Sequence, residues 1–216
     1  TTRGVAMPIL ESSGKPFALA MVPERTIEGK ALAELSSLPQ IIGGLDEASA
    51  EAASRLFGAL GIEIVSVGSP EAAELAKLAS NTYRDLNFAF ANELAYFADT
   101  AGIDVYEVIH ACNYGYDRMN LAKPGPVAGP CLEKDAYILS NSADLLDTAV
   151  PLSIEGRKTN ERVVSHVRAI LQAADVNARS AAIVGLAFKG QPETSDVRGS
   201  LAADFALAMR DELKLD

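Results

Sequence analysis

The chain has 216 residues, 49% of them hydrophobic and 22% charged, which is enough apolar material for a folded core and excludes intrinsic disorder. A formal net charge of -10 disfavours nucleic acid and anionic membranes as partners, because both would repel the chain. Two cysteines, Cys112 and Cys131, are too few for a disulfide framework, and no apolar run reaches the length of a membrane span. We therefore expect a cytoplasmic protein with no secretory signal and no membrane segment.

Short strands alternate with helical patterns in the first third of the chain. Residues 17–22, 40–43 and 62–67 are short apolar or alternating segments typical of strands. Residues 46–60 form an alanine-rich amphipathic pattern, and Asp46 is placed to cap that helix. This alternation predicts an α/β layer.

The middle third begins with a long helical pattern. From residue 69 to residue 100 there is no glycine, and the one proline, Pro70, follows Ser69 at a position that suits the first turn of a helix. Apolar residues then recur at helical spacing until Gly102. The pattern predicts a helix of about 30 residues, longer than usual in globular proteins and typical of helices that cross a domain or an interface.

The elements that follow are shorter. Asp104 is placed to cap a helix that runs to about Cys112, and residues 113–130 form a loop rich in Asn, Gly, Tyr and Pro. One helix is expected to begin near Cys131, and another to run over about residues 152–174.

The last part of the chain begins an α/β unit. Residues 181–186 are typical of a buried strand, and residues 200–213 predict a helix. One strand and one helix are too few for a domain, so we expect this unit to start here and to remain incomplete.

The segment with the most distinctive chemistry is the glycine- and proline-rich stretch 125–130, which leads into Cys131. Lys134 and Asp135 follow one helical turn later. A thiol at a helix N-terminus beside a cation is a setting that favours a nucleophile. The alternative is that Cys131 packs as a small buried hydrophobe, as most lone cysteines do.

Two pairs of polar residues could accompany this cysteine. Lys77 and Asn81 lie four residues apart on one face of the long helix, where Lys77 could stabilise a negatively charged oxygen; a solvated helix face is the alternative. Glu24 and Glu28 follow the first predicted strand, where ligand sites of α/β sheets lie, although a surface turn would also place two carboxylates there.

Other residues are weaker candidates. Cys112 ends an apolar helical stretch and is expected to be buried and inert. His110 and His166 have no ligand-like companions, so we expect neither a metal site nor a catalytic base there. The sequence has no Gly-x-Gly-x-x-Gly fingerprint, so it shows no complete dinucleotide-binding half.

Four ordered segments resemble motifs of the UDP-glucose/GDP-mannose dehydrogenase family: residues 23–31, 74–81, 125–135 and 185–189. The resemblance implies a mainly α fold with α/β pieces. A helical dimerisation domain, like the C-terminal domain of 6-phosphogluconate dehydrogenase, would be flanked by incomplete Rossmann-like parts. Ala128, where the family usually has glycine, departs from the pattern.

The resemblance also implies domain limits. Residues 1–68 would be the C-terminal remnant of an NAD-binding Rossmann domain, and residues 69–178 the central helical dimerisation and catalytic domain. Residues 179–216 would start a UDP-sugar-binding Rossmann-like domain. The chain would then be truncated at both ends, with the NAD-binding domain largely absent, and would form a homodimer through its long central helices.

The chemistry that the resemblance implies is oxidation of the C6 hydroxymethyl group of a nucleotide sugar to a carboxylate, with NAD as cofactor. Cys131 would be the nucleophile, carrying first a thiohemiacetal and then a thioester. Lys77 would stabilise the oxyanions, Asn81 and Asp135 would place the water, and Glu24 would assist as a base.

Binding roles follow from the same resemblance, and no metal is implied. The positions that match NAD-proximal residues are Glu28, Lys134 and Arg198. The positions that match substrate-binding residues are Phe188 and Lys189, at the turn that touches uridine diphosphate, and Arg118, which would reach the sugar nucleotide of the neighbouring subunit.

For the substrate, residues 23–29 resemble the members that act on UDP-N-acetylhexosamines, and within this group we favour UDP-N-acetylmannosamine, with a role in polysaccharide biosynthesis. Two alternatives stay open. The chain could be an inactive dimerisation module, or the protein could be a single-step hydroxyacid dehydrogenase, whose superfamily shares a Lys-x-x-x-Asn helix motif but needs no thiol.

Overall fold

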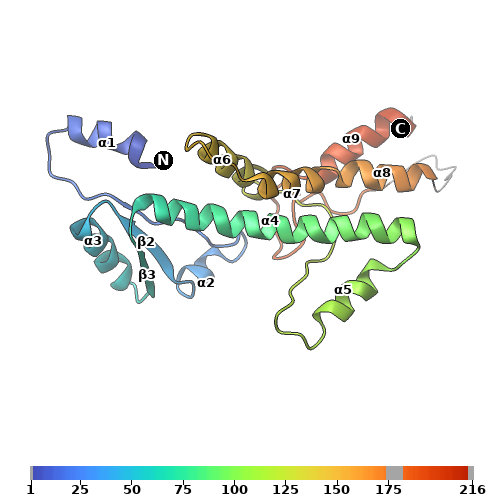
Figure 1. Cartoon of the computed structure of the whole chain (residues 1–216), viewed down its shortest axis with the longest axis horizontal. Helices are drawn as coiled ribbons and strands as arrows, with labels where there is room; N and C mark the ends of the chain where they lie inside the picture. The colour runs from blue at the N-terminus through green and yellow to red at the C-terminus, as the bar shows by residue number, and fades with distance from the viewer. Residues whose placement is uncertain (1, 174–181, 214–216) are drawn as a thin grey trace. The chain divides into compact units, whose positions relative to one another are not determined.

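The computed structural model describes residues 2–173 and 182–213, in two compact units, Thr1–Ser80 and Asn81–Asp216 (Figure 1). The division falls inside helix α4 (Pro70–Ala101), whose 32 residues confirm the long helix predicted from the glycine-free segment. Helices dominate the described residues, and a small sheet lies in the first unit, which confirms the predicted fold class. The three predicted domain limits stay predictions.

The sheet of the first unit has the order β1 (Ala20–Met21), β2 (Gln40–Gly44) and β3 (Ile64–Val67). Figure 1 labels β2 and β3. β1 pairs with β2 in antiparallel orientation, and β2 pairs with β3 in parallel orientation, with Ile41 opposite Val65. Every residue of β2 is buried, whereas β3 is partly exposed. The core of the first unit therefore lies around its central strand.

Helix α3 (Glu47–Gly58) follows β2 and begins where the sequence predicts. The backbone N–H of Ser49 donates to Asp46 Oδ1 at 2.7 Å, so Asp46 is the N-cap, and this hydrogen bonding lowers the pKa of Asp46. A Cβ at Gly44 would lie 2.5 Å from the backbone nitrogen of Ala50, so the absence of a side chain lets α3 start directly against the sheet. The first unit also contains α1 (Thr2–Ser12) and α2 (Ala31–Leu35).

The second unit is helical in its described residues. Besides most of α4 it contains α5 (Val105–Asn113), α6 (Leu132–Asp144), α7 (Pro151–Glu161), α8 (Val163–Ala173) and α9 (Leu201–Leu213). Asp104 caps α5 as predicted, because Asp104 Oδ1 accepts a hydrogen bond from Tyr106 N at 2.8 Å. Ala91 and Ala98 of α4 pack against Val105 and Ile109 of α5 in a hydrophobic cluster.

One predicted helix is two helices. The sequence pattern predicts a single helix over residues 152–174, but α7 ends at Glu161 and α8 begins at Val163. Between them, Arg162 N donates to Thr159 O three residues earlier, at 3.3 Å, so the chain tightens for one turn and the regular hydrogen bonding is interrupted. Residue 174 lies outside the described residues.

Two predicted strands also differ in the structure. Residues 182–186 form no strand, because no other strand in the described part of the second unit offers backbone partners; residue 181 lies outside that part. The strand predicted over residues 17–22 shortens to β1, because it pairs only with Gly43 and Gly44 at the end of β2. The strands predicted at 40–43 and 62–67 are confirmed as β2 and β3.

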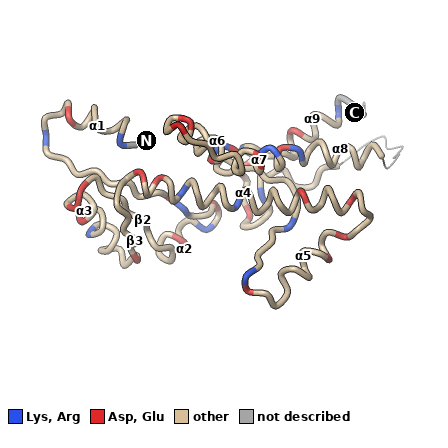
Figure 2. The backbone as a smooth tube through the Cα atoms, in the orientation of Figure 1, with Lys and Arg blue, Asp and Glu red and all other residues tan. Residues whose placement is uncertain are grey.

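Charge is mixed along the chain. Figure 2 shows acidic and basic residues interspersed, with no continuous basic stretch, in keeping with the net charge of -10. Within the described residues, none of the helices is both long and apolar enough to cross a membrane.

We predict that Ile42→Ala lowers the free energy of unfolding by about 2–5 kcal/mol, because Ile42 is 0% exposed in β2 and its loss leaves a cavity. Urea unfolding of this chain measures the change. Val65→Ala, on the neighbouring strand and 44% exposed, is the control and should cost less than about 1 kcal/mol. Equal losses of unfolding free energy in the two variants would contradict the conclusion that the core of the first unit lies around β2.

Candidate active site

Cys131 occupies the N-cap position of α6, at the end of the glycine- and proline-rich loop. Its carbonyl oxygen accepts hydrogen bonds from Asp135 N at 3.1 Å and Lys134 N at 3.3 Å, which close the first turn. The side chain makes no capping hydrogen bond, and Cys131 is exposed. It therefore does not pack as a small buried hydrophobe, and its thiol is accessible in the structure.

Asn81 and Asp135 are brought together from 54 residues apart in the sequence. Asn81 Nδ2 on α4 donates to Asp135 Oδ2 on α6 at 2.6 Å, and Asp135 is buried. The carboxylate keeps further lone pairs for other donors, such as a water or a substrate hydroxyl. Two of the five predicted catalytic residues thus share a hydrogen bond one turn beyond Cys131.

Lys77 and Glu24 are brought together within the first unit. Lys77 Nζ donates to the backbone oxygen of Glu24 at 2.6 Å. The Glu24 carboxylate is directed elsewhere, because it accepts hydrogen bonds from the backbone N–H and the hydroxyl of Thr26. Lys77 and Glu24 are therefore joined by a hydrogen bond from the lysine ammonium group to a backbone carbonyl, and not by an ion pair between their side chains.

The predicted substrate-binding residues lie in two places of the second unit. Phe188 packs on the loop before Cys131: a Cβ at Gly129 would lie 2.6 Å from the Phe188 ring, so this approach requires glycine. Lys189 Nζ lies 5.2 Å from the centre of the same ring. Arg118 lies 4.7 Å from the ring centre of Tyr116 on an exposed loop.

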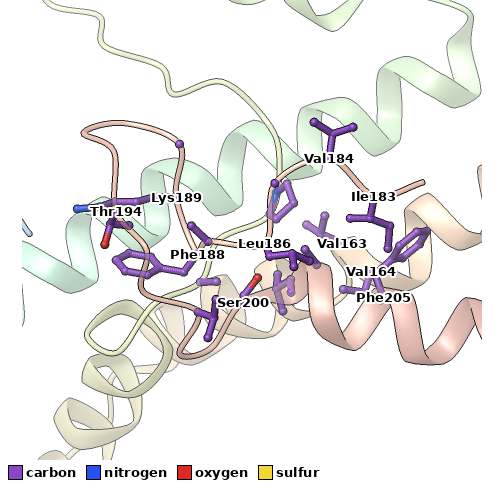
Figure 3. A pocket seen from close by; sticks show the side chains of 18 of the residues that line it. Val163, Val164, Ile183, Val184, Leu186, Phe188, Lys189, Thr194, Ser200 and Phe205 are labelled. Atoms are coloured by element: carbon purple, nitrogen blue, oxygen red, sulfur yellow. The ribbon is translucent and has the colours of Figure 1, made fainter. Parts of the chain in front are cut away.

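Phe188 and Lys189 also line a largely apolar cavity of about 870 Å³ (Figure 3). Val163 and Val164 of α8 form part of its wall, and Phe205 of α9 lies close to them. The segment 183–190, expected as a strand and turn, runs along this cavity. The turn predicted to contact a nucleotide therefore borders both the cavity and the Cys131 loop.

The residues assigned to NAD give a partial fit. Glu28 and Lys134 are exposed, and Arg198 forms a close ion pair with Asp196 at 2.5 Å. The sequence lacks the glycine fingerprint, and in the described first unit only β2 and β3 are parallel. The described residues therefore match only part of a dinucleotide site.

Residues set aside in the sequence analysis have ordinary surroundings. His166 Nε2 lies 2.7 Å from Asp99 Oδ2, and the ring of His166 packs on Tyr96 at 4.3 Å between centres, so His166 joins α8 to α4. Cys112 is only partly buried, whereas the sequence predicts a buried and inert cysteine. Among the described residues, no group of three or more His, Cys, Asp or Glu side chains could hold a metal.

Three asparagines that the sequence analysis did not select hold the loop before Cys131. The side-chain amide of each one donates a hydrogen bond to a backbone oxygen of the loop and accepts one from a backbone N–H. The backbone partners are Leu121 N and O for Asn113, Ala122 N and Asn120 O for Asn87, and Gly125 N and O for Asn92. A side chain that pairs with a donor and an acceptor of the loop replaces the partners that a strand would supply. The loop is therefore fixed although it has no regular structure.

A buried ion pair continues this arrangement. Arg157 of α7 and Asp85 of α4 are 2% and 1% exposed, and Arg157 Nη1 donates to Asp85 Oδ1 at 2.8 Å. Asn160 Nδ2 donates to the same oxygen at 2.8 Å. Burial raises the pKa of Asp85, and the positive charge of Arg157 opposes that rise.

A sequence signal for these residues exists. Asn81, Asp85 and Asn92 are polar positions separated by four and seven residues, so they interrupt an otherwise apolar stripe on one side of a helix. Arg157 and Asn160, three residues apart, share a face of the later helix. The pattern does not reveal which polar residues on the two helices pair.

Comparisons with known proteins find chains that are similar to this one. Residues 71–162 match the UDP-glucose/GDP-mannose dehydrogenase family, central domain. UDP-N-acetyl-D-mannosamine dehydrogenases from Pyrococcus horikoshii and Methanocaldococcus jannaschii are 34% and 35% identical to this chain, and the matches cover 93% of it and 48% and 46% of the relatives. The chain therefore spans about half the length of the curated relatives it matches.

Solved structures give the same result. A UDP-D-ManNAc dehydrogenase from Pyrococcus horikoshii superposes with a TM-score of 0.86 at 34% identity, covering 97% of this chain and 52% of the other. A UDP-glucose dehydrogenase from the hyperthermophilic archaeon Pyrobaculum islandicum gives a TM-score of 0.84 at 28% identity, covering 96% and 49%. The chain is thus similar to members of the UDP-glucose/GDP-mannose dehydrogenase family, and the match to the family itself covers residues 71–162. Within it, the relatives described above at 34% and 35% identity are UDP-N-acetyl-D-mannosamine dehydrogenases.

We predict that Arg157→Met destabilises this chain by about 3–5 kcal/mol at neutral pH, because it leaves the Asp85 carboxylate buried without its cation. Urea unfolding measures the loss. The double variant Asp85→Leu/Arg157→Met should recover most of it, since no buried charge remains. A double variant no more stable than the single one would contradict this explanation.

The same variant should have a distinct pH dependence. Without Arg157, burial raises the pKa of Asp85 further above its unfolded value, so the folded state binds the proton more tightly. The variant is then most stable below the unfolded pKa of Asp85 and loses stability as pH rises through the folded pKa. The stability gap to the wild type should therefore widen as pH rises from the unfolded pKa of Asp85 toward its raised folded pKa. A gap that is constant with pH would contradict the prediction.

Proposed function

We propose that the complete protein containing this chain is an NAD-dependent nucleotide-sugar 6-dehydrogenase that works through a thioester on Cys131. The observation that carries the proposal is an accessible Cys131 at the start of α6, with Asp135 one turn later hydrogen-bonded to Asn81. The family and the names of the relatives support the same reaction class.

The overall reaction converts a primary alcohol and water to a carboxylate with loss of four electrons. NAD, when bound, would accept a hydride in each of the two oxidation steps. Between them the Cys131 sulfur would add to the aldehyde carbon, forming a C–S bond, while the carbonyl oxygen takes a proton. After the second oxidation, water would attack the thioester carbon, and the C–S bond would break to leave the carboxylate and the thiol.

The other side chains would act around this sulfur. Asp135, oriented by Asn81 and buried, would accept a hydrogen bond from the attacking water. Lys77 is a cationic donor whose present partner is a backbone oxygen, and it would stabilise the oxyanion states by exchanging that partner. Glu24 would assist as a base once its carboxylate leaves Thr26.

For the substrate we propose a UDP-N-acetylhexosamine, and UDP-N-acetylmannosamine in particular. The support is the set of relatives: several are UDP-N-acetyl-D-mannosamine dehydrogenases, and one from Ralstonia nicotianae, 35% identical over 140 residues, is an NDP-N-acetyl-D-galactosaminuronic acid dehydrogenase. Phe188, Lys189 and Arg118 would bind the nucleotide, and Glu28, Lys134 and Arg198 would contact NAD.

We predict that Cys131→Ala in the complete protein lowers uronic acid formation by at least about 1,000-fold, because the covalent intermediate cannot form. Coupled measurement of NADH and acid checks this. Cys112→Ala is the matched control and should keep the activity. Full acid formation by Cys131→Ala would overturn the proposal, and one NADH per sugar in the wild type would favour a single-step dehydrogenase.

We also propose that α4 forms a homodimer interface. Tyr83, Phe90 and Phe97 recur every seven residues on this helix and are 68%, 51% and 69% exposed. A stripe of aromatic side chains at this spacing is suited to a second helix, because residues seven apart lie on the same side. The surface buried between two copies of α4 would include these large aromatic side chains, which contribute most of the binding energy in many interfaces.

We predict that Phe90→Glu/Phe97→Glu converts a dimer of this chain to a monomer, because the added charges would be buried at the interface. Light scattering with an equilibrium NAD titration measures mass and cofactor binding. Leu145→Glu is the control and should stay dimeric, because Leu145 is 80% exposed at the C-cap of α6 and lies outside the stripe on α4. A monomeric wild type would refute the interface, and a dimer that does not bind NAD would favour the inactive dimerisation module.

A further inference from the structure

We propose that Asp85, Asn92, Arg157 and Asn160 are positioning residues that fix the Cys131 loop for thioester chemistry. These four side chains form one connected set of hydrogen bonds between α4, α7 and the loop. The hydrogen bonds of this set reach the backbone on either side of Cys131 and not Cys131 itself, so these residues would act through the backbone of the loop. The inference rests on the proposed function for its catalytic consequence, but the anchoring itself can be tested without any reaction.

The order of donors and acceptors along these hydrogen bonds is fixed by Asp85. Asp85 Oδ1 accepts from Arg157 Nη1 and from Asn160 Nδ2, both at 2.8 Å, and the Asp85 backbone oxygen accepts from Asn160 Nδ2 at 2.9 Å. An ionised carboxylate only accepts hydrogen bonds, so both neighbours must present donors to it. The amide of Asn160 is therefore oriented with its nitrogen toward Asp85 and its oxygen away.

The orientation of the Asn160 amide in turn fixes the orientation of the Asn92 amide, which bonds to the loop. Because Asn160 presents its oxygen, Asn92 Nδ2 donates to it at 2.8 Å, and the same nitrogen donates to Gly125 O at 3.1 Å. Asn92 Oδ1 then accepts from Gly125 N at 2.7 Å. Both backbone groups of Gly125, at the start of the loop that leads to Cys131, are held in one orientation.

Arg157 holds the loop on both sides of the cysteine. Arg157 Nη2 donates to Val127 O at 3.1 Å, four residues before Cys131, and Arg157 Nη1 lies 3.4 Å from Leu132 O, one residue after it. A rigid guanidinium that contacts both carbonyls sets the separation between them. The backbone on either side of Cys131 is thus fixed relative to α7.

The energetics favour a positioning role over a purely stabilising one. A buried ion pair gains little over apolar residues of the same volume, because desolvation offsets the attraction. Within the described residues Asp85 Oδ2 has no hydrogen-bond partner, which adds to that cost. What the set provides is a unique orientation of the loop, and nucleophilic attack needs such orientation, because small displacements of reacting atoms slow it strongly.

The test uses Asn92→Leu, which keeps the side-chain volume but removes every hydrogen bond to Gly125 and Asn160. Arg157→Lys is the second variant, in case the first does not fold; it keeps the charge beside Asp85 but loses the planar fork. The matched control is Leu86→Ala. Leu86 packs on Gly156 at the contact of α4 with α7 and makes no hydrogen bond to the loop, so this change weakens the same helix pair.

The first readout is amide hydrogen exchange of this chain. In Asn92→Leu, exchange over residues 125–132 should rise about tenfold relative to α5, the factor expected from losing one or two net hydrogen bonds. Leu86→Ala should raise the amide exchange rates of residues 125–132 and of α5 by the same factor. Unchanged relative exchange in Asn92→Leu, or the same relative rise in both variants, would overturn the anchoring.

The second readout is the number of NADH formed per sugar by the complete protein, with hydroxylamine present to trap aldehyde. A displaced thiol should leave the first oxidation intact and stall the second, so NADH per sugar should fall from two toward one and trapped aldehyde should accumulate. Leu86→Ala should lower the amount of active enzyme without changing this ratio. A ratio of two in Asn92→Leu and Arg157→Lys would overturn the positioning role. A wild type without dehydrogenase activity would instead refute the proposed function, and the exchange result would still decide the anchoring.

Discussion

The buried pair of Arg157 and Asp85 is the constraint on which the second unit depends. A guanidinium and a carboxylate removed from water must find partners for their remaining donors and acceptors, because unpaired polar groups are costly in a medium of low dielectric constant. Asn160, Val127 O and Leu132 O supply most of those partners, and Asp85 Oδ2 is left without one in the described residues, so pairing the two charges brings α4, α7 and the loop together. Gly156 lets the two helices approach closely enough for this, because a Cβ there would lie 2.4 Å from the Leu86 side chain.

The candidate site separates reactive groups from groups that hold them. Cys131 is exposed, whereas Asp85, Asn92 and Arg157 are almost fully buried. This division has a physical basis: a nucleophile must be reached by substrate, while hydrogen bonds that set geometry are stronger and less exchangeable away from water. Asp135 belongs to both groups of residues. It is buried on α6 like the residues that set geometry, and it can still accept a hydrogen bond besides the one from Asn81.

Several local patterns in the sequence predict structure reliably here, and others do not. The N-caps Asp46 and Asp104 and the long helix α4 follow from residue chemistry within one or two turns, so neighbouring residues suffice to predict them. Among residues 182–186 no strand forms, because a strand needs hydrogen-bond partners from elsewhere in the chain. Over residues 152–173 the expected single helix is divided in two, because local backbone bonding can interrupt a helix at one residue.

The sequence by itself determined the resemblance to the family, the mainly helical class and the candidate nucleophile, because these depend on ordered motifs and on residues close together in the chain. Only the tertiary structure decided that Asn81 bonds Asp135, that Lys77 bonds the backbone of Glu24, and that buried asparagines and Arg157 hold the cysteine loop. The reason is physical: a hydrogen bond requires two groups within about 3 Å in a suitable orientation, and for residues 50 or more positions apart only packing brings this about.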